Sequence, residues 1–308
     1  MTPAPEPRGP DAGGRTSALG DGPSVVAVGG GHGLATTLRA ARGYAGDLTA
    51  VVSVADDGGS TGRLRAAAPR TAPGDLRKCL VAMASTDAPI VSAMEHRFTS
   101  GELDGHAFGN LLLVALQETQ GDLVGALDEA GRILGCVGRV LPTTTEPVEL
   151  HARVDSGGVV RGQVAVGERT DLRSVTVAPG DAAACEPAVR AILAADQLVL
   201  GPGSLYTSVL AATAVTGIGD AVGRTRAQVV YVCNLQPQIS ETAGYTVADH
   251  VAALERHGLH PDVVLYDPAA IGGADGVERA LATPLARPSG RAHDPQLLGR
   301  ALAEVLVG

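Results

Sequence analysis

The chain has 308 residues and a formal net charge of −9 at pH 7. This length can hold one large domain or two ordinary ones with a sizeable core. The acidic balance argues against a general nucleic-acid-binding protein, which needs a concentrated basic face, and no stretch reaches the ~18 uninterrupted apolar residues of a membrane span. We therefore expect a cytoplasmic protein that binds a small molecule.

Two residue types narrow the chemistry further. The cysteines Cys79, Cys136, Cys185 and Cys233 lie far apart and form no C-x-x-C pair, so we interpret them as buried thiols rather than a zinc site or a disulfide framework. Lys78 is the single lysine and no G-K-[S/T] sequence is present, which argues against a P-loop ATPase.

The chain begins with a predicted tail, a strand and a glycine turn. Residues 1–23 are rich in Pro, Gly and polar residues and predict a disordered tail, whereas Ser24–Val28 is typical of a buried parallel strand. A helical pattern starts after the turn residues Gly29, Gly30, Gly31, His32 and Gly33. Because free N–H groups and the positive dipole end of a helix attract phosphate, this turn predicts an anion site, where His32 either contacts the phosphate or only fills a turn position.

A second apolar strand, about Leu48 to Val54, runs into paired carboxylates and a glycine-rich turn. Small residues let backbone N–H groups approach phosphate oxygens, and an arginine neutralises them. We expect an anionic ligand here, with Mg²⁺ on the two carboxylates if a metal is bound; the alternative is a tight turn in which Asp and Gly only satisfy backbone geometry. The residues concerned are Asp56, Asp57, Gly58, Gly59, Ser60 and Arg63.

A helical insertion is predicted next, from Pro73 onwards, with Asp75 as the N-cap of its first helix. Within it, His106 and Asn110 are four residues apart beside a glycine-rich loop. They either project polar groups towards a ligand, or Asn110 only caps a helix. The alternating pattern of 148–154 and 159–164 then predicts a hairpin added to the main sheet, with a structural role.

A second strand, glycine turn and helix start follows Gln197–Leu200, where Gly201, Gly203 and Ser204 form another predicted anion cradle. After a strand at 229–233, Asn234, Gln236 and Glu241 offer hydrogen bonds suited to a base or a sugar, and Thr246 caps a helix. Towards the end of the chain we predict a helix near 277–282 and another from Pro295 to Val307. Asp294 is the expected N-cap of the latter, and Arg291 is a candidate phosphate clamp.

Taken together, these segments resemble the YvcK-like gluconeogenesis factor family, which belongs with the 2-phospho-L-lactate transferases in one CofD-like superfamily. His32 stands where many relatives have threonine, and the chain after Tyr266 matches poorly. The matching segments occur in the family's order and are Gly29 to Ala35, Val54 to Arg65, Pro73 to Leu80, Gly105 to Leu112, Arg139 to Pro142, Gly201 to Ser208, and Gln236 to His250.

The resemblance implies a single Rossmann-like α/β domain over 24–308, a three-layer sandwich with a mainly parallel sheet and its site at the strand ends. It also implies that the Gly29 to Gly33 turn, Asp56, Asp57, Gly203, Ser204 and Asn234 line a nucleotide site. In the YvcK-like branch the implied ligand is a UDP-sugar such as UDP-N-acetylglucosamine, and the implied role is support of cell shape and wall synthesis during gluconeogenic growth.

Three functions compete at this point. A nucleotide-sugar-binding regulator agrees with two glycine cradles and with the lack of an obvious nucleophile or general-base pair, and it is compatible with a homo-oligomer and regulatory protein partners. A Mg²⁺-dependent phosphotransferase of the 2-phospho-L-lactate transferase type would use Asp56 and Asp57 to hold the metal. An NAD(P) dehydrogenase is disfavoured because Leu34 replaces the third glycine of the dinucleotide fingerprint.

Overall fold

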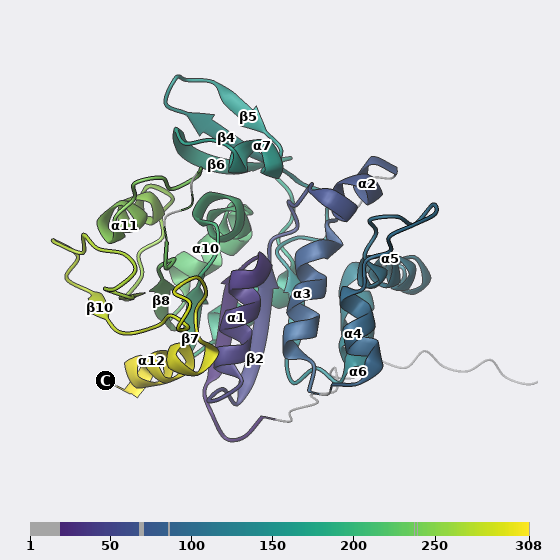
Figure 1. Ribbon diagram of the computed structural model, residues 1–308, viewed down its shortest axis with the longest axis horizontal. Helices are drawn as coiled ribbons and strands as arrows, with labels where there is room; N and C mark the ends of the chain where they lie inside the picture. The colour runs from purple at the N-terminus through teal and green to yellow at the C-terminus, as the bar shows by residue number, and fades with distance from the viewer. Residues whose placement is uncertain (1–18, 68–70, 86, 237, 239, 308) are drawn as a thin grey trace, which may run out of the picture.

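A parallel β-sheet runs through the centre of the molecule in the computed structural model (Figure 1). The structure describes residues 19–67, 71–85, 87–236, 238 and 240–307, so residues 1–18 of the predicted tail lie outside it. Within the described residues, seven strands pair in the order β10-β9-β8-β7-β1-β2-β3, and each pair is parallel. The strands are β1 (Ser24–Gly29), β2 (Asp47–Val52), β3 (Arg139–Pro142), β7 (Gln197–Leu200), β8 (Gln228–Val232), β9 (Val263–Tyr266) and β10 (Ala280–Ala282).

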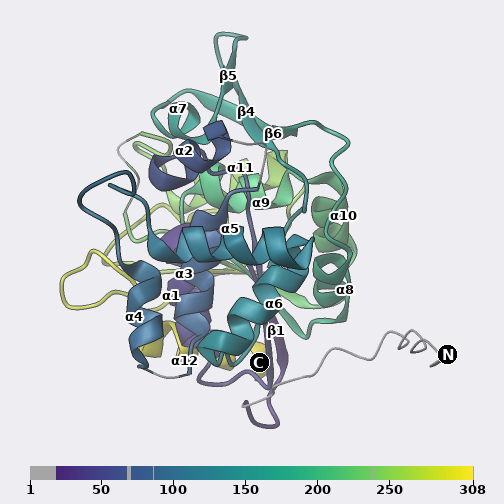
Figure 2. The same cartoon turned by 90° about the vertical axis from the view of Figure 1, so that its right-hand side faces the viewer.

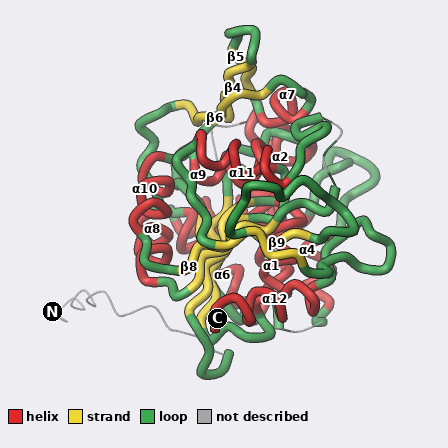
Figure 3. Tube along the Cα trace, turned by 90° about the vertical axis from the view of Figure 1, so that its left-hand side faces the viewer, coloured by secondary structure: helices red, strands yellow, loops and turns green. Residues whose placement is uncertain are grey.

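Helices cover both faces of this sheet, which confirms the predicted three-layer α/β architecture. On one face lie α1 (Gly31–Ala41), α3 (Pro73–Met83) and α12 (Pro295–Val307), and on the other lie α8 (Glu186–Ala194), α9 (Ala211–Thr213) and α10 (Thr216–Arg224) (Figure 3). The central strands are therefore mostly apolar, and the side chains of β1 from Val25 to Val28 are at most 1% exposed.

The predicted helical insertion lies between β2 and β3. Besides α3 it contains α2 (Gly59–Ala67), α4 (Pro89–Glu95), α5 (Phe108–Gln120) and α6 (Leu123–Leu134). Helix α5 packs on α3, α4 and α6, and Figure 2 shows it crossing in front of the sheet.

The strand order reverses its direction between β1 and β7. From β1 the chain proceeds outward to β2 and β3, and from β7 it proceeds outward in the opposite direction to β8, β9 and β10. Such a topological switch point opens a crevice at the carboxyl ends of the strands, which is where open α/β sheets bind ligands. Both glycine turns that were identified in the sequence follow these two strands.

The predicted hairpin forms a separate sheet instead of extending the main one. Strands β4 (Glu149–Val154), β5 (Val159–Arg161) and β6 (Leu172–Ala178) pair antiparallel in the order β5-β4-β6. The second strand was predicted to reach Val164, but it ends at Arg161, and the short helix α7 (Gln163–Gly167) follows. In Figures 1 and 2 this small sheet lies at the top of the molecule, above the main sheet and close to α2.

Near the C-terminus one expectation is wrong and two are confirmed. Residues 280–282 were predicted to be helical, but they form edge strand β10, because Ala280 pairs in parallel with Val264 of β9. Thr246 caps α11 (Val247–Arg256) in a capping box with Asp249. The carboxylate of Asp294 accepts hydrogen bonds from the N–H groups of the first turn of α12.

The four cysteines are buried and unpaired, as predicted. Within the described residues, no single helix is both long enough and apolar enough to cross a membrane. The bent pair Leu205–Thr213 and Thr216–Arg224 passes the same test of length and composition, and its first part is buried in the core.

Candidate functional site

The two glycine turns touch each other at the switch point. A Cβ atom on Gly33 would lie only 2.0 Å from the carbonyl oxygen of Pro202, and one on Gly203 would lie 3.6 Å from the carbonyl oxygen of Gly30. The hydroxyl of Thr37, in α1, donates a hydrogen bond to the carbonyl of Gly201 at 2.9 Å. The two turns are therefore in contact, and glycine at position 33 is what allows the close approach.

The start of α1 is open. Its N-cap is Gly30, which has no side chain, and Gly31 has a φ of 65°. The first intrahelical bond runs from Leu34 N–H to the Gly30 carbonyl at 3.4 Å, so the preceding N–H groups lack partners within the helix. The His32 side chain reaches the surface here, and the partial desolvation of its imidazole, followed by the charge of Lys78, lowers its pKa. Such a helix start can accept an anion.

Asp75 faces this turn, and it is not the N-cap that the sequence predicted. The N-cap of α3 is Ala72, and Asp75 lies in the first turn. Its carboxylate accepts a hydrogen bond from the Lys78 ammonium at 2.9 Å, and a Cβ on Gly30 would lie 2.6 Å from its Oδ2 atom. Asp75 is a candidate site residue that the sequence analysis missed, because local cap chemistry explained it equally well.

Asp56 lies close to Asp75. Its Oδ1 atom accepts a hydrogen bond from Gly58 N–H at 3.1 Å, and a Cβ on Gly74 would lie 3.0 Å from its Oδ2 atom. Burial, followed by the negative charge of Asp75, raises the pKa of Asp56. A divalent cation between the two carboxylates would relieve this repulsion, so the pair fits Mg²⁺ chemically. No group of three or more metal-ligating side chains occurs among the described residues.

Asp57 is turned towards the small sheet rather than towards Asp56. Its two oxygens accept hydrogen bonds from Gln163 N–H and Val164 N–H, each at 3.0 Å. These are the first N–H groups of α7, so Asp57 ties the acidic turn to this helix. The two neighbouring aspartates therefore have different partners.

The other predicted residues of this turn meet the start of α5. The Ser60 hydroxyl lies 3.2 Å from His106 Nδ1 and accepts a hydrogen bond from Asn110 Nδ2 at 3.2 Å. Asn110 is 2% exposed, and its Oδ1 atom has no partner within the described residues. Arg63 packs against Gly105. The four predicted residues Ser60, Arg63, His106 and Asn110 thus come together, and their contacts join α2 to α5.

The second glycine turn is held by the chain segment that follows β8. Asn234 brackets Gly203, since its Oδ1 accepts from Gly203 N–H at 3.0 Å and its Nδ2 donates to the Gly203 carbonyl at 2.7 Å. Gln238 Nε2 donates to the Ser204 hydroxyl at 2.7 Å. Gln236 is exposed.

Glu241 occupies the start of η1 (Leu205–Leu210), the helix after this turn. Its Oε2 atom accepts hydrogen bonds from Tyr206 N–H at 3.0 Å and Thr207 N–H at 3.2 Å, and the Thr207 hydroxyl donates to Oε1. The sequence analysis assigned Glu241 to a base or a sugar. The N-cap of η1 is Ser204, a residue type that ordinarily caps a helix, so the local sequence carried no signal that an acceptor from elsewhere in the chain would be needed.

Arg291 is exposed in a turn near the C-terminus. Nearby, His293 forms an isolated antiparallel bridge with Ala286, and its Nε2 atom lies 3.2 Å from the carbonyl oxygen of Cys233, the residue that follows β8. The C-terminal segment therefore contacts the chain immediately before Asn234.

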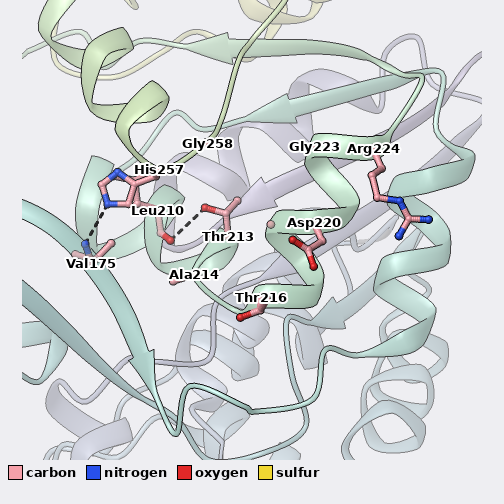
Figure 4. A pocket seen from close by; sticks show the side chains of 11 residues that line it. Val175, Leu210, Thr213, Ala214, Thr216, Asp220, Gly223, Arg224, His257 and Gly258 are labelled. Atoms are coloured by element: carbon pink, nitrogen blue, oxygen red, sulfur yellow. Dashed lines mark hydrogen bonds between the residues drawn. The ribbon is translucent and has the colours of Figure 1, made fainter.

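A separate cavity of 480 Å³ lies between β6, α10 and the C-terminal end of α11 (Figure 4). His257 lies on one side of it and accepts a hydrogen bond from Val175 N–H at 3.0 Å, while Asp220 lies on the other side. No lining residue of this cavity belongs to either glycine turn.

Comparisons with known proteins place the chain among relatives of the same architecture. The family model "2-phospho-L-lactate transferase CofD" matches residues 25–277. A crystal structure of a UPF0052 family member from Bacillus halodurans superposes with a TM-score of 0.87 at 32% identity, covering 92% of this chain and 99% of that one.

Relatives of similar sequence carry one functional name. A "Putative gluconeogenesis factor" of Mycobacterium leprae is 43% identical over 94% of this chain and 88% of its own length. The "Gluconeogenesis factor" of Halalkalibacterium halodurans is 38% identical over 79% of this chain and 77% of its own length. A relative from Nostoc is 41% identical over 76% of this chain, which spans about half the length of that protein (52%). The chain therefore belongs to the 2-phospho-L-lactate transferase CofD family, in the branch of the YvcK-like gluconeogenesis factors.

Proposed function

We propose that this protein binds a nucleotide sugar of the UDP-N-acetylglucosamine type at the switch point between β1 and β7. The observation that carries the proposal is the contact between the two glycine turns there, with Gly33 against Pro202. Ligands of open parallel sheets bind at this position, and two strand-turn-helix units in contact provide backbone N–H groups for a diphosphate.

Each part of the ligand has a candidate partner. The open start of α1, from Gly31 to Gly33, suits the diphosphate. Asp56 and Asp75 would hold Mg²⁺ beside it, and that ion would neutralise phosphate charge. Asn234, which fixes Gly203 from both sides, shapes the opposite wall.

The biological role that we propose follows the relatives. Because proteins named gluconeogenesis factors match most of this chain, we propose a cytoplasmic regulator that supports cell shape and wall synthesis during growth on gluconeogenic carbon sources. Regulation by ligand binding requires no catalytic group, and it agrees with the engagement of Ser60 and His106 in helix contacts.

Titration calorimetry tests the proposal directly. UDP-N-acetylglucosamine, UDP and GDP are titrated into the full chain with and without Mg²⁺, and we expect the uridine ligands to bind more tightly when Mg²⁺ is present. The control variant Gly223→Ala, in α10, where an added Cβ meets no atom within 4 Å, should bind these ligands as the parent chain does. Absence of heat with millimolar UDP-N-acetylglucosamine, while another nucleotide binds, would remove the proposed ligand.

The proximity of Asp56 and Asp75 favours a second candidate, a Mg²⁺-dependent phosphotransferase like the transferase that names the family. Two neighbouring carboxylates at a strand end can hold a metal that neutralises charge on a moving phosphoryl group. The test is incubation with a guanylyl-phospholactate donor, a deazaflavin acceptor and Mg²⁺. Product that disappears in Asp75→Asn but persists in the exposed control Asp47→Asn would establish transfer, and absence of product in the parent chain would argue against it.

A further inference from the structure

The two helix starts at the switch point differ in one respect. No side chain within the described residues caps α1, whose N-cap is Gly30. At η1, by contrast, Glu241 accepts hydrogen bonds from the N–H groups of Tyr206 and Thr207 and from the Thr207 hydroxyl. The carboxylate of the chain itself therefore occupies the place that a phosphate would take at η1.

Glu241 is deeply buried, with 3% of the residue exposed. Burial raises its pKa above the ordinary value of a glutamate, although the three hydrogen bonds from Tyr206 and Thr207 oppose this shift. Among the described residues, its charge is therefore balanced by N–H and O–H dipoles rather than by a cation. Helix α7 closes over the carboxylate, since a Cβ on Gly167 would lie 3.6 Å from its Oε1 atom. Such a side chain is held in place by its surroundings, and it excludes a second anion by its volume, to which its poorly screened charge adds repulsion.

We propose that Glu241 is a specificity-determining residue that sets the direction of the nucleotide across the switch point. It keeps phosphate away from the start of η1, so that the diphosphate binds at the start of α1 and the uncharged nucleoside lies towards Gly203 and Ser204. This inference rests on the proposed nucleotide site and assigns an orientation to the ligand in it.

Anion binding by variants tests the blocking role. Glu241→Ala removes the carboxylate, Glu241→Gln keeps its volume without the charge, and Glu304→Ala removes an exposed glutamate as the matched control. Thermal unfolding is followed with increasing inorganic phosphate at saturating UDP, with NaCl adjusted to constant ionic strength. Phosphate should raise the Tm of Glu241→Ala by about 2 °C at ten times its Kd, and it should leave the parent chain, Glu241→Gln and Glu304→Ala unchanged.

Acetate provides a second readout of the anion site that Glu241→Ala opens. Because it is a small carboxylate, it should restore part of the lost stability of Glu241→Ala without affecting the other proteins. Equal responses of all four proteins to both anions would overturn the inference. If Glu241→Ala does not fold, a crystal of the parent chain with UDP decides: phosphates at the N–H groups of Gly31 to Gly33 support the orientation, and phosphates at Tyr206 and Thr207 overturn it.

The results separate the two proposals. A parent chain that binds UDP, together with a Glu241→Ala variant that gains no anion site, would refute the role of Glu241 and leave the nucleotide site standing. A Glu241→Ala variant that gains the anion site, together with a parent chain that binds no nucleotide, would refute the proposed function. Glu241 would then still be the residue that excludes anions from the start of η1.

Discussion

Replacing Gly33 by alanine is the sharpest available test of the contact between the two glycine turns. The added Cβ would lie 2.0 Å from the Pro202 carbonyl oxygen, 2.6 Å from its carbonyl carbon and 2.9 Å from Gly203 Cα. All three are backbone atoms, so no side-chain rotation can relieve the overlap.

The size of the effect follows from these distances. An ordinary contact at this Cβ begins at 3.4 Å, so the turns must separate by about 1.4 Å along the line to the Pro202 oxygen. Overpacking of well-packed regions costs about 1–3 kcal/mol, and the rigid backbone places Gly33→Ala at the upper end. The same displacement moves the Gly31 to Gly33 N–H groups away from the second turn, so nucleotide affinity should fall on the order of tenfold or more.

Two measurements separate stability from binding. Urea unfolding gives the free energy of unfolding of Gly33→Ala, and titration with UDP gives its affinity at a temperature where the variant is folded. Gly223→Ala, in α10, is the control, and it should gain about 0.5–1 kcal/mol because alanine is favoured over glycine inside a helix. If Gly33→Ala keeps the parent stability and UDP affinity, the turns are not packed as described.

Three further predictions concern charged or titratable groups. Burial lowers the pKa of His293 to about 4 from an ordinary value of 6.5, so between these values the unfolded chain binds a proton that the folded chain does not. The free energy of unfolding should therefore fall by about 3 kcal/mol as the pH is lowered from 6.5 to 4. The unfolding of His293→Gln should depend less on pH, and a pH profile like that of the parent chain would contradict this. Asp57→Ala should lower the free energy of unfolding by about 1 kcal/mol and speed hydrogen exchange at the first two N–H groups of α7, because that helix loses its cap. Unaltered exchange at these groups would refute the contact between Asp57 and α7. Asp75→Asn should lower the pKa of Asp56, because the charge of Asp75 helps to raise it, and a carboxyl NMR titration that shows no decrease would exclude the pair as neighbours.

Much of the fold could be predicted because its signals are local. The apolar β-branched runs of β1 and β8, the glycine turns after β1 and β7, and the caps at Thr246 and Asp294 depend on residues a few positions apart. The hairpin was found for the same reason, although its sheet was assigned wrongly, because pairing with β6 is not encoded in the hairpin itself.

Strand β10 at 280–282, which was predicted to be helical, shows the opposite limit. Its residues favour a helix locally, and they become extended because β9 offers an open edge with which Ala280 and Ala282 pair. Edge pairing supplies hydrogen bonds that local propensity cannot anticipate.

The sequence by itself determined the α/β class, the alternation of strand, glycine turn and helix, and the segments from which a site would be built, since these follow from neighbouring residues. Only the tertiary structure decided what the acidic side chains of the candidate site contact. Asp57 caps a helix 106 positions away, and Glu241 reaches back 34 positions to η1. A carboxylate binds whichever N–H groups the fold brings to it, and no local pattern records that distance.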